Sequence, residues 1–467
     1  MTTNGEEVLN MSEEQDEPDI ESKLSPSALA VVRSLQSIEE GIDLDLFQST
    51  SESERLIMMV NTYRGSLYDD LKERLEIVVK LGNIRFISQP DILREVESLW
   101  SSNASRLSRT ELRALEAVLN KPDANLSELA DISKMTYSQC RRAMQRLKDS
   151  RVFSVEGMIN LQKFGLERIL LILENPSLVL SGPYIYKTLI VDGPTTYAFL
   201  VSVIPNDHVD DFLALLPSLR NVATSVSAWR LSEGHPRFSP HHFSYYRPDW
   251  RPNLFHFRLL LRNSDEPLIL GDLPSRIKIK VTLTPSDLKI ADHLLYNFEA
   301  TTHEIMESTS LSESTIFRRR IQLIENEYVI PRARIDIPLL NERVVAILDP
   351  ESAGEVINAW NFLPLTYVSR IDRITDARNL ESKVLLLTSI PAGSGREILQ
   401  VLSEEVSFVN DWSAFVVSTG HDERIPILSM FDTRKDNWKW NLGFFDLRAL
   451  SVVRSECTSQ NTPFDLA

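Results

Sequence analysis

Cysteine is nearly absent from this sequence: only Cys140 and Cys457 occur among 467 residues. Two cysteines are too few for a disulfide framework or a cysteine-based zinc site, so we expect a reducing compartment, the cytoplasm. The sequence also lacks an uninterrupted apolar run of ~18 residues and the basic and apolar start of a signal peptide. We therefore expect neither a membrane span nor export by a signal peptide.

Motifs of the common enzyme classes are missing as well. The sequence contains no GxGxxG, P-loop, GxSxG or HExxH pattern. The eight histidines are scattered, and only His241 and His242 are adjacent, so a surface loop explains them more simply than a metal site. We expect a protein that is not an enzyme and that holds no cofactor or metal.

The negative charge is concentrated at the start of the chain. The formal net charge is -16, and residues 1–22 hold eight carboxylates with no lysine or arginine, so the remaining chain carries only -8 (-16 less -8). Such a segment is typical of a disordered acidic tail. The overall charge therefore does not exclude nucleic acid as a partner of the rest of the chain.

What the sequence does contain is a long internal repeat. The stretch LSRTELRALEAVLNKPDANLSELADISKMTYSQCRRAMQRLKDSRVFSV begins at Leu107 and aligns without a gap with the stretch that begins at Leu283, at an offset of 176. Further on, PYIYKTL matches PLTYVSR, and WRPNLFHF matches WKWNLGFF. These matches predict a tandem duplication after residue 105.

Each copy has the pattern of a winged helix-turn-helix. In the first copy, residues 110–119 and 127–132 have helical patterns, and residues 137–149 place Cys140, Met144 and Leu147 on one helical face. The alternating segment VFSVEGMINL then predicts a β-ribbon or wing, and YVIPRARIDI takes its place in the second copy. Helix, helix, turn, helix and wing is the order of a winged helix-turn-helix.

A βαββαβ order follows each wing, which predicts a ferredoxin-like domain. In the second copy the segments are RVVAILD, PESAGEVINAWNF, LTYVSRIDRI, SKVLLLTSI, GSGREILQVLSEE and FVNDWSAFVVST; in the first copy the first helix is shortened to NPSLVLSG. A closing segment rich in aromatics and arginine is predicted to add one strand per copy. The predicted fold class is α+β, with tandem winged helix-turn-helix and ferredoxin-like (βαββαβ) domains.

The predicted domains follow from these segments. They are an acidic disordered tail (1–22), a helical N-terminal region (23–104), a first winged helix-turn-helix (105–160), a first ferredoxin-like regulatory domain with its aromatic and arginine extension (161–280), a second winged helix-turn-helix (281–337) and a second ferredoxin-like domain (338–455). Residues 23–104 are read as a packing or dimerisation segment, or as a degenerate winged helix at their end.

The stretch SELADISKMTYSQCRRAMQRLKDSRVFSV resembles the DNA-binding domain of the Lrp/AsnC (feast/famine) family of transcription regulators. The ferredoxin-like segment behind it resembles the regulatory domain of that family. The resemblance implies double-stranded DNA as a partner, association into homodimers or larger rings, and a small-molecule effector such as an amino acid.

Two helices would carry the DNA contacts. On a helical wheel, polar side chains face away from the apolar arc, and arginine and glutamine side chains can read guanine and adenine in the major groove. Arg320 falls inside the apolar arc of the second helix and is expected to snorkel along it. The candidate DNA-binding residues are Ser138, Gln139, Arg141, Arg142, Gln145, Ser314, Thr315, Arg318, Arg319 and Gln322.

The sequence thus predicts a sequence-specific, DNA-binding transcription regulator of Lrp/AsnC type. One alternative is a protein-interaction adaptor built on winged helices. A second alternative is an enzyme similar to the siroheme decarboxylases, which resemble Lrp/AsnC proteins. The histidine pattern associated with those enzymes is absent, because KFGLERILLIL and LLNERVVAIL contain no histidine.

Overall fold

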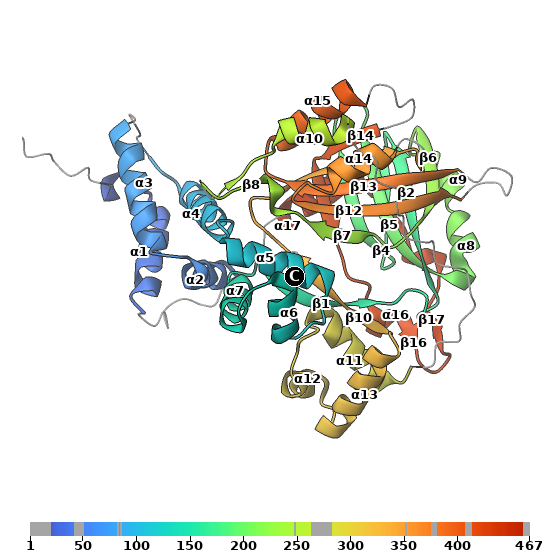
Figure 1. Ribbon diagram of the computed structural model, residues 1–467. Coiled ribbons are helices and arrows are strands. Elements are labelled where there is room, and N and C mark those ends of the chain that lie inside the picture. The colour runs from blue at the N-terminus through green and yellow to red at the C-terminus, as the bar shows by residue number, and fades with distance from the viewer. Residues whose placement is uncertain are drawn as a thin grey trace, which may run out of the picture. The chain divides into compact units, whose positions relative to one another are not determined.

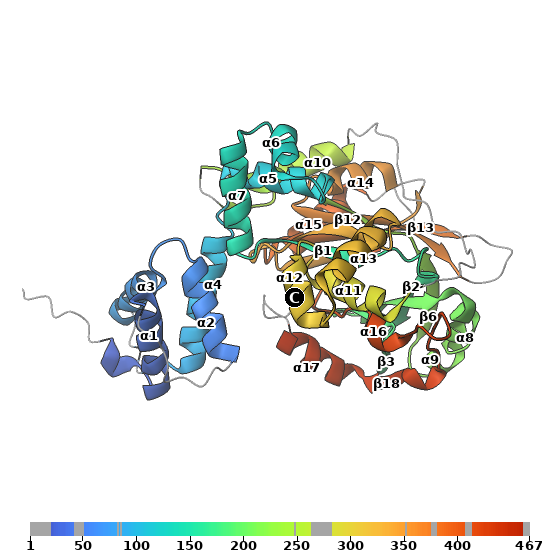
Figure 2. The ribbon, with the colours of Figure 1, turned by 90° about the horizontal axis from the view of Figure 1, so that it is seen from below.

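The computed structural model describes residues 20–41, 51–81, 84, 86–246, 249–262, 283–350, 353–374, 381–406 and 413–460. The chain divides into two compact units, residues 1–104 and 105–467 (Figures 1 and 2). The structure combines helices with a large sheet, which is the α+β class. Almost all of the predicted acidic tail lies outside the described residues. Among the described helices, none has the length and apolar character needed to cross a membrane.

The first unit is helical. Its core is formed by apolar side chains at helical spacing, such as Leu67, Leu71 and Leu75 on α3, and the indole N–H of Trp100 donates to the Thr62 hydroxyl at 2.8 Å. Its helices are α1 (Pro26–Glu39), α2 (Ser51–Thr62), α3 (Leu67–Leu81) and α4 (Gln89–Ala104), with a short 3-10 turn η1 (Glu21–Lys23) before them.

The second unit contains two sets of three helices, each followed by a strand. Five of these six helices begin with a capping box, in which a side chain at the N-cap and one three residues later bond each other's backbone N–H groups. The sets are α5 (Arg109–Asn120), α6 (Leu126–Ser133), α7 (Tyr137–Asp149) and β1 (Phe153–Ile159), and α11 (Pro285–Tyr296), α12 (Thr302–Thr309), α13 (Glu313–Glu325) and β10 (Val329–Ile335).

Strands β1 and β10 pair with each other in an antiparallel ribbon that joins the two sets. The register runs from Phe153 opposite Ile335 to Ile159 opposite Val329. Helix α11 packs on β1 and α5 packs on β10, so each helical set rests on the strand of the other. The buried residues Val155, Ala333 and Ile335 place the ribbon in the core of the unit.

One long sheet forms the centre of the second unit, in the order β14-β11-β13-β12-β6-β2-β5-β4-β15, with β7 also paired to β12. All of its described pairings are antiparallel. Its strands are β2 (Leu166–Glu174), β4 (Ile185–Val191), β5 (Tyr197–Pro205), β6 (Ser225–Leu231), β7 (His235–Phe238), β11 (Glu342–Leu348), β12 (Leu365–Arg373), β13 (Ser382–Ile390), β14 (Ser413–Val417) and β15 (Thr419–Asp422).

The sheet has a first half, formed by β2, β4, β5 and β6, and a second half, formed by β11, β12, β13 and β14. The two halves exchange edge strands. Strand β7 follows the first half in sequence but pairs with β12 of the second, while β15 follows the second half and pairs with β4 of the first. The segment after β15 continues this exchange, since β18 (Asp446–Ala449) pairs with β3 (Leu178–Ser181). Each half is therefore completed by chain that belongs, in sequence, to the other.

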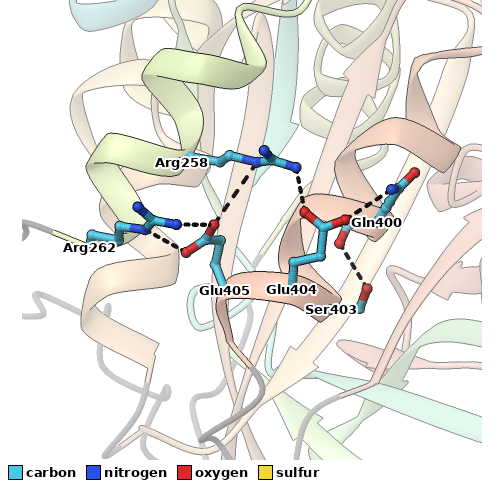
Figure 3. A network of polar contacts seen from close by, with 6 residues as sticks. All are labelled: Arg258, Arg262, Gln400, Ser403, Glu404 and Glu405. Carbon is cyan, nitrogen blue, oxygen red and sulfur yellow. Dashed lines mark hydrogen bonds and ion pairs between the residues drawn. The ribbon is translucent and has the colours of Figure 1, made fainter.

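Helices cover the outer face of the second half of the sheet. Helix α14 (Ala353–Trp360), helix α15 (Ser394–Glu405) and helix α10 (Leu254–Arg262) bury Trp360, Val401 and Phe257 in one cluster with alternate residues of β11 and β13. Figure 3 shows how the polar edge of α10 is attached: Arg258 pairs with Glu404, and both Nε and Nη2 of Arg262 bond Glu405 at 2.6 Å.

The remaining elements are short. They are α8 (Val209–Leu213), α9 (Leu216–Leu219), α16 (Ile427–Met430), α17 (Leu450–Gln460), the 3-10 turns η2 (Asn206–His208), η3 (Pro240–His242) and η5 (Leu442–Phe444), and the two-residue strands β8 (Phe243–Ser244), β9 (Asp249–Trp250), β16 (Phe431–Asp432) and β17 (Asn437–Trp438).

Two secondary-structure predictions are wrong. The segment NPSLVLSG, predicted as a shortened helix, contains strand β3, because Leu178–Ser181 finds a partner strand in β18. The first closing segment, predicted to add one strand, contains the two-residue strands β8 and β9, and its end forms helix α10, whose Phe257 and Leu261 are spaced for one helical face. Outside these two segments, the strands and helices predicted after each wing are present in the described residues.

Candidate functional site

The second unit contains a cavity of about 1210 Å³, which we call the chamber. Its walls come from β2, β4 and β5 of one half of the sheet, from β11, β12 and β13 of the other half, from β15, and from the β1–β10 ribbon. Small-molecule sites usually measure roughly 300–1,000 Å³. The chamber therefore has room for a large ligand.

The apolar part of the wall follows from strand alternation. On β11, Val344 points to the helices while Val345 belongs to a second cluster on the opposite face. That second cluster joins Leu170 and Phe199 of the first half to Val345 and Val417 of the second, so the two halves face each other here. This shared face carries apolar and aromatic side chains at the base of the chamber.

Charged side chains of both signs line the rest of the wall. The six cations are Arg168, Lys187, Arg332, Arg334, Arg343 and Arg424, and the five carboxylates are Glu156, Glu233, Asp336, Asp422 and Glu423. The sum is +1 (six less five) in a chain whose formal net charge is -16. The chamber is thus a local exception to the acidic character of the protein.

The cations Lys187 and Arg343 both pair with the carboxylate of Asp422. The Lys187 Nζ lies 3.0 Å from an Asp422 carboxylate oxygen, and the Arg343 Nη2 lies 3.9 Å from the other. Burial raises the pKa of Asp422, but Lys187 and Arg343 outweigh it and hold the pKa at about 2. Burial lowers the pKa of Lys187, and the charges of Arg343 and Arg332 lower it further. The charge of Asp422 raises this pKa, but the net shift is downward.

A second group sits at the ribbon. Glu156 on β1 pairs with Arg334 on β10 at 2.9 Å and with Arg424 at 3.3 Å. Arg334 also approaches Asp336 at 3.8 Å, and burial raises the pKa of Asp336 above its ordinary value, against the charges of Arg334 and Arg343. These side chains therefore bond mainly to one another.

Arg168 and Arg332 differ from the other cations of the chamber. Among the described residues, neither lies within ion-pair distance of a carboxylate. The guanidinium of Arg168 lies 5.9 Å from the ring centroid of Tyr186, and that of Arg332 lies 5.7 Å from the ring centroid of Tyr367. Burial raises the pKa of the Tyr186 phenol while both arginines oppose that rise, so the two guanidinium groups lie near the same ring.

Three residues of the chamber wall also carry a buried polar atom. The Nε of Arg168, the hydroxyl of Thr419 and Nη1 of Arg424 are buried and have no hydrogen-bond partner in the described part of the chain. All three residues line the chamber.

Sequence reasoning did not find this site. A signal was present: Glu167-Arg168 and Glu342-Arg343 occupy matching places in the aligned parts of the sequence, and so do Tyr186 and Tyr367. Arg168 is the one cation of β2, whose other residues are apolar except for Glu167 and Glu174. Arg168 could therefore have been singled out from the sequence. That it lies near Arg332 could not, because this proximity depends on the exchange of strands.

The predicted DNA-binding residues of the first copy lie together on α7. Cys140, Met144 and Leu147 are buried, as the helical wheel predicts. Ser138, Gln139, Arg141, Arg142 and Gln145 are exposed. Two of them bond within their own helix, since the Arg142 Nε donates to the Ser138 carbonyl at 3.2 Å and the Gln145 amide donates to Asp149 at 2.7 Å. Gln139 caps the start of the helix through Thr136.

On α13, the expectation that Arg319 is free for an outside partner is wrong. Its Nη1 lies 3.4 Å from the carboxylate of Asp287, which is buried. Arg320 is partly buried and donates to the carbonyl oxygens of Phe298, at 2.8 Å, and Ala300. Ser314, Arg318 and Gln322 are exposed, and Thr315 is half-buried.

The helical wheel puts Ile316, Phe317, Ile321, Leu323 and Ile324 of α13 in one apolar arc, and this prediction is wrong in part. Ile316 and Leu323 are buried, but Phe317 is 62% exposed and Ile321 is 38% exposed. Helix α13 therefore buries a narrower face than its sequence pattern indicates, because Arg320 and not Phe317 occupies the contact with the preceding helices.

Neither a protein-family model nor a curated protein sequence matches this chain. Two solved structures are similar to it: the siroheme decarboxylase NirDL, with 12% identity and a TM-score of 0.38, and the same enzyme with an iron-uroporphyrin III analogue, with 13% identity and a TM-score of 0.39. Each match covers 68% of this chain and 93% of the other.

These matches correct two predictions from the sequence. The identification as an Lrp/AsnC transcription regulator is wrong, because the similar solved structures are those of an enzyme. The prediction that the protein is not an enzyme is corrected by the same finding.

Proposed function

We propose that the chamber binds a small molecule that carries carboxylates, and that the protein is an enzyme acting on this molecule. The observation that carries the proposal is the pair Arg168 and Arg332, which line the chamber without a carboxylate partner among the described residues. A guanidinium group can bind a carboxylate through two parallel hydrogen bonds, and a ligand can reach both side chains, because Arg332 is exposed and Arg168 is partly buried. Tyr186 and Tyr367 supply ring faces beside these groups.

Siroheme, after which the similar solved enzyme is named, is the first candidate substrate. Its acidic side chains match Arg168 and Arg332, which lack a carboxylate partner among the described residues although Arg168 donates to the Ser232 carbonyl at 3.4 Å. Its flat ring system matches a chamber with an apolar base. No histidine lines the chamber among the described residues, so the proposal assigns substrate binding to the carboxylate contacts and not to iron.

The test is a titration of the full chain with siroheme, followed by absorbance, and with iron-free uroporphyrin, followed by fluorescence. We expect Arg168→Gln and Arg332→Gln each to raise the Kd about tenfold, which is ~1.4 kcal/mol. Arg434→Gln is the matched control, because Arg434 is exposed and outside the chamber. Equal affinity of all three variants and the unmodified protein, or no binding of either compound, would refute the proposal.

The finer description of the fold is part of this proposal. We take α5–α7 with β1, and α11–α13 with β10, as two winged helix-turn-helix units, each followed by a ferredoxin-like half of the sheet. Residues with positive φ support this description, because Lys134 and Ser310, and Arg151 and Glu327, occur at the same 176-residue offset as the sequence repeat. Domain limits at 105–160, 161–280, 281–337 and 338–455 follow.

A second candidate function, contact with double-stranded DNA, is favoured by the exposed face of α7. Arg141 and Arg142 are exposed there, and both basic side chains can reach phosphates. Replacing both by alanine should lower the log-log salt slope of duplex binding by about 2, since each phosphate contact contributes about 1. Duplex binding that is the same in this variant, or that does not depend on salt, would favour the protein-interaction adaptor instead.

A further inference from the structure

We propose that Lys187 is a reactive amine, which forms an imine with an aldehyde or ketone group of a ligand in the chamber. The inference rests on the proposed function only in that the chamber must admit a small anionic molecule. It adds a covalent step and a carbonyl-bearing ligand class.

The position of Lys187 is the first argument. It lies on β4, and its cross-strand partner on β15 is Asp422, so the backbone fixes the two side chains side by side. The Lys187 side chain is 23% exposed, and it lines the chamber. It is the one lysine among the described lining residues. A ligand in the chamber therefore meets this amine and no other.

The surrounding charges are the second argument. An amine attacks a carbonyl only in its neutral form, and burial or a neighbouring cation favours that form. Arg343 approaches the same carboxylate as Lys187, at 3.9 Å, and Arg332 also lies in the wall. Burial and these two arginines lower the pKa of Lys187 against Asp422, while Tyr186 is the adjacent titratable group on β4.

The reaction balances without a further reagent. The neutral Nζ attacks the carbonyl carbon, a C–N bond forms, and a proton moves to the oxygen to give a carbinolamine. Loss of that oxygen as water then gives a protonated imine, so one ammonium and one carbonyl become one iminium and one water. The Asp422 carboxylate, 3.0 Å from Nζ, offsets the positive charge of the ammonium before the reaction and that of the iminium after it.

The alternative is that Lys187 only joins two strands by an ion pair. Lys383 provides the matched control for this alternative. Its side chain is 18% exposed and it lies 3.5 Å from Glu381 and 3.9 Å from Asp349, but it does not line the chamber. An ion pair with partial burial is common to both lysines, so a difference in their reactivity must come from the chamber.

The test uses pyridoxal 5′-phosphate, an anionic aromatic aldehyde, with the full-length protein at pH 7.5. Imines are reduced with borohydride, and the modified lysines are identified by peptide mass spectrometry. We expect Lys187 to be labelled at least tenfold faster than Lys383, and the Lys187→Arg variant to lose this site alone. Labelling of Lys187 no faster than that of Lys383 would overturn the proposal.

Two further variants separate a reactive amine from an exposed one. Asp422→Asn removes the charge that raises the pKa of Lys187, so labelling should become faster; Arg343→Gln removes a charge that lowers it, so labelling should become slower. Circular dichroism checks that both variants fold, and shifts in the reverse directions would overturn the inference. Selective labelling without porphyrin binding supports the inference and refutes the carboxylate ligand; porphyrin binding without labelling does the opposite.

Discussion

The indole N–H of Trp438 donates a hydrogen bond of 2.8 Å to the backbone carbonyl of Phe164, although 274 residues separate them. Their rings also lie in contact, with centroids 6.1 Å apart. Next to them, the Tyr184 hydroxyl bonds the carbonyl of Lys439. The closing segment of the second half is thereby attached to the first half.

Trp438 and Trp250, which align with each other in the sequence, should differ in their tolerance of substitution. Both are buried, but the Trp250 Nε1 has no acceptor among the described residues. Trp438→Phe should lower the free energy of unfolding by about 1–3 kcal/mol more than Trp250→Phe, because it leaves the Phe164 carbonyl without its donor. Urea unfolding of the two variants compares them directly, and equal losses would show that the hydrogen bond contributes little.

Arg319 should contribute to the stability of the fold, whereas its neighbour Arg318 should contribute almost nothing. Arg319→Met removes the cation beside buried Asp287, which also caps α11 through Thr284, and should cost about 1–3 kcal/mol. Arg318→Met should change the free energy of unfolding by less than ~0.5 kcal/mol, since Arg318 is exposed. Chemical denaturation measures both, and a stable Arg319→Met variant would contradict the structural role.

Gly157 should not tolerate a methyl group. A Cβ there would lie 2.6 Å from the Leu294 carbonyl oxygen and 2.7 Å from a Val329 methyl, where the ribbon meets α11. Gly157→Ala should destabilise the protein by about 1–3 kcal/mol. Gly193→Ala, whose Cβ meets nothing closer than 3.6 Å, is the control and should be close to neutral in thermal unfolding.

His242 should make the protein less stable in mild acid. Burial, with smaller contributions from His241 and His256, lowers its pKa to about 4, so the fold disfavours the charged form. Its contribution is complete above the unfolded pKa of about 6.5 and is lost as the pH falls from there to about 4, a loss on the order of 3 kcal/mol. Urea midpoints between pH 7.5 and 4.5 test this, and His242→Asn should flatten that slope.

The sequence by itself determined the local structure. The capping pairs Thr136 with Gln139 and Thr301 with Glu304, followed by apolar residues at helical spacing, fix where α7 and α12 begin, because these interactions reach only a few residues along the chain. The strands of the long sheet other than β7 and β15 were predicted from their apolar runs for the same reason, whereas HPRF and TGHD have no such run.

The tertiary structure alone decided the partners of those elements. The sequence does not show that β15 pairs with β4, that Leu178–Ser181 is a strand completed by β18, or that Arg319 is neutralised by Asp287. It does not show either that Arg168 and Arg332 lie near one tyrosine in a shared chamber. Pattern and propensity act between neighbours in sequence, whereas these contacts depend on how the two halves exchange their edge strands.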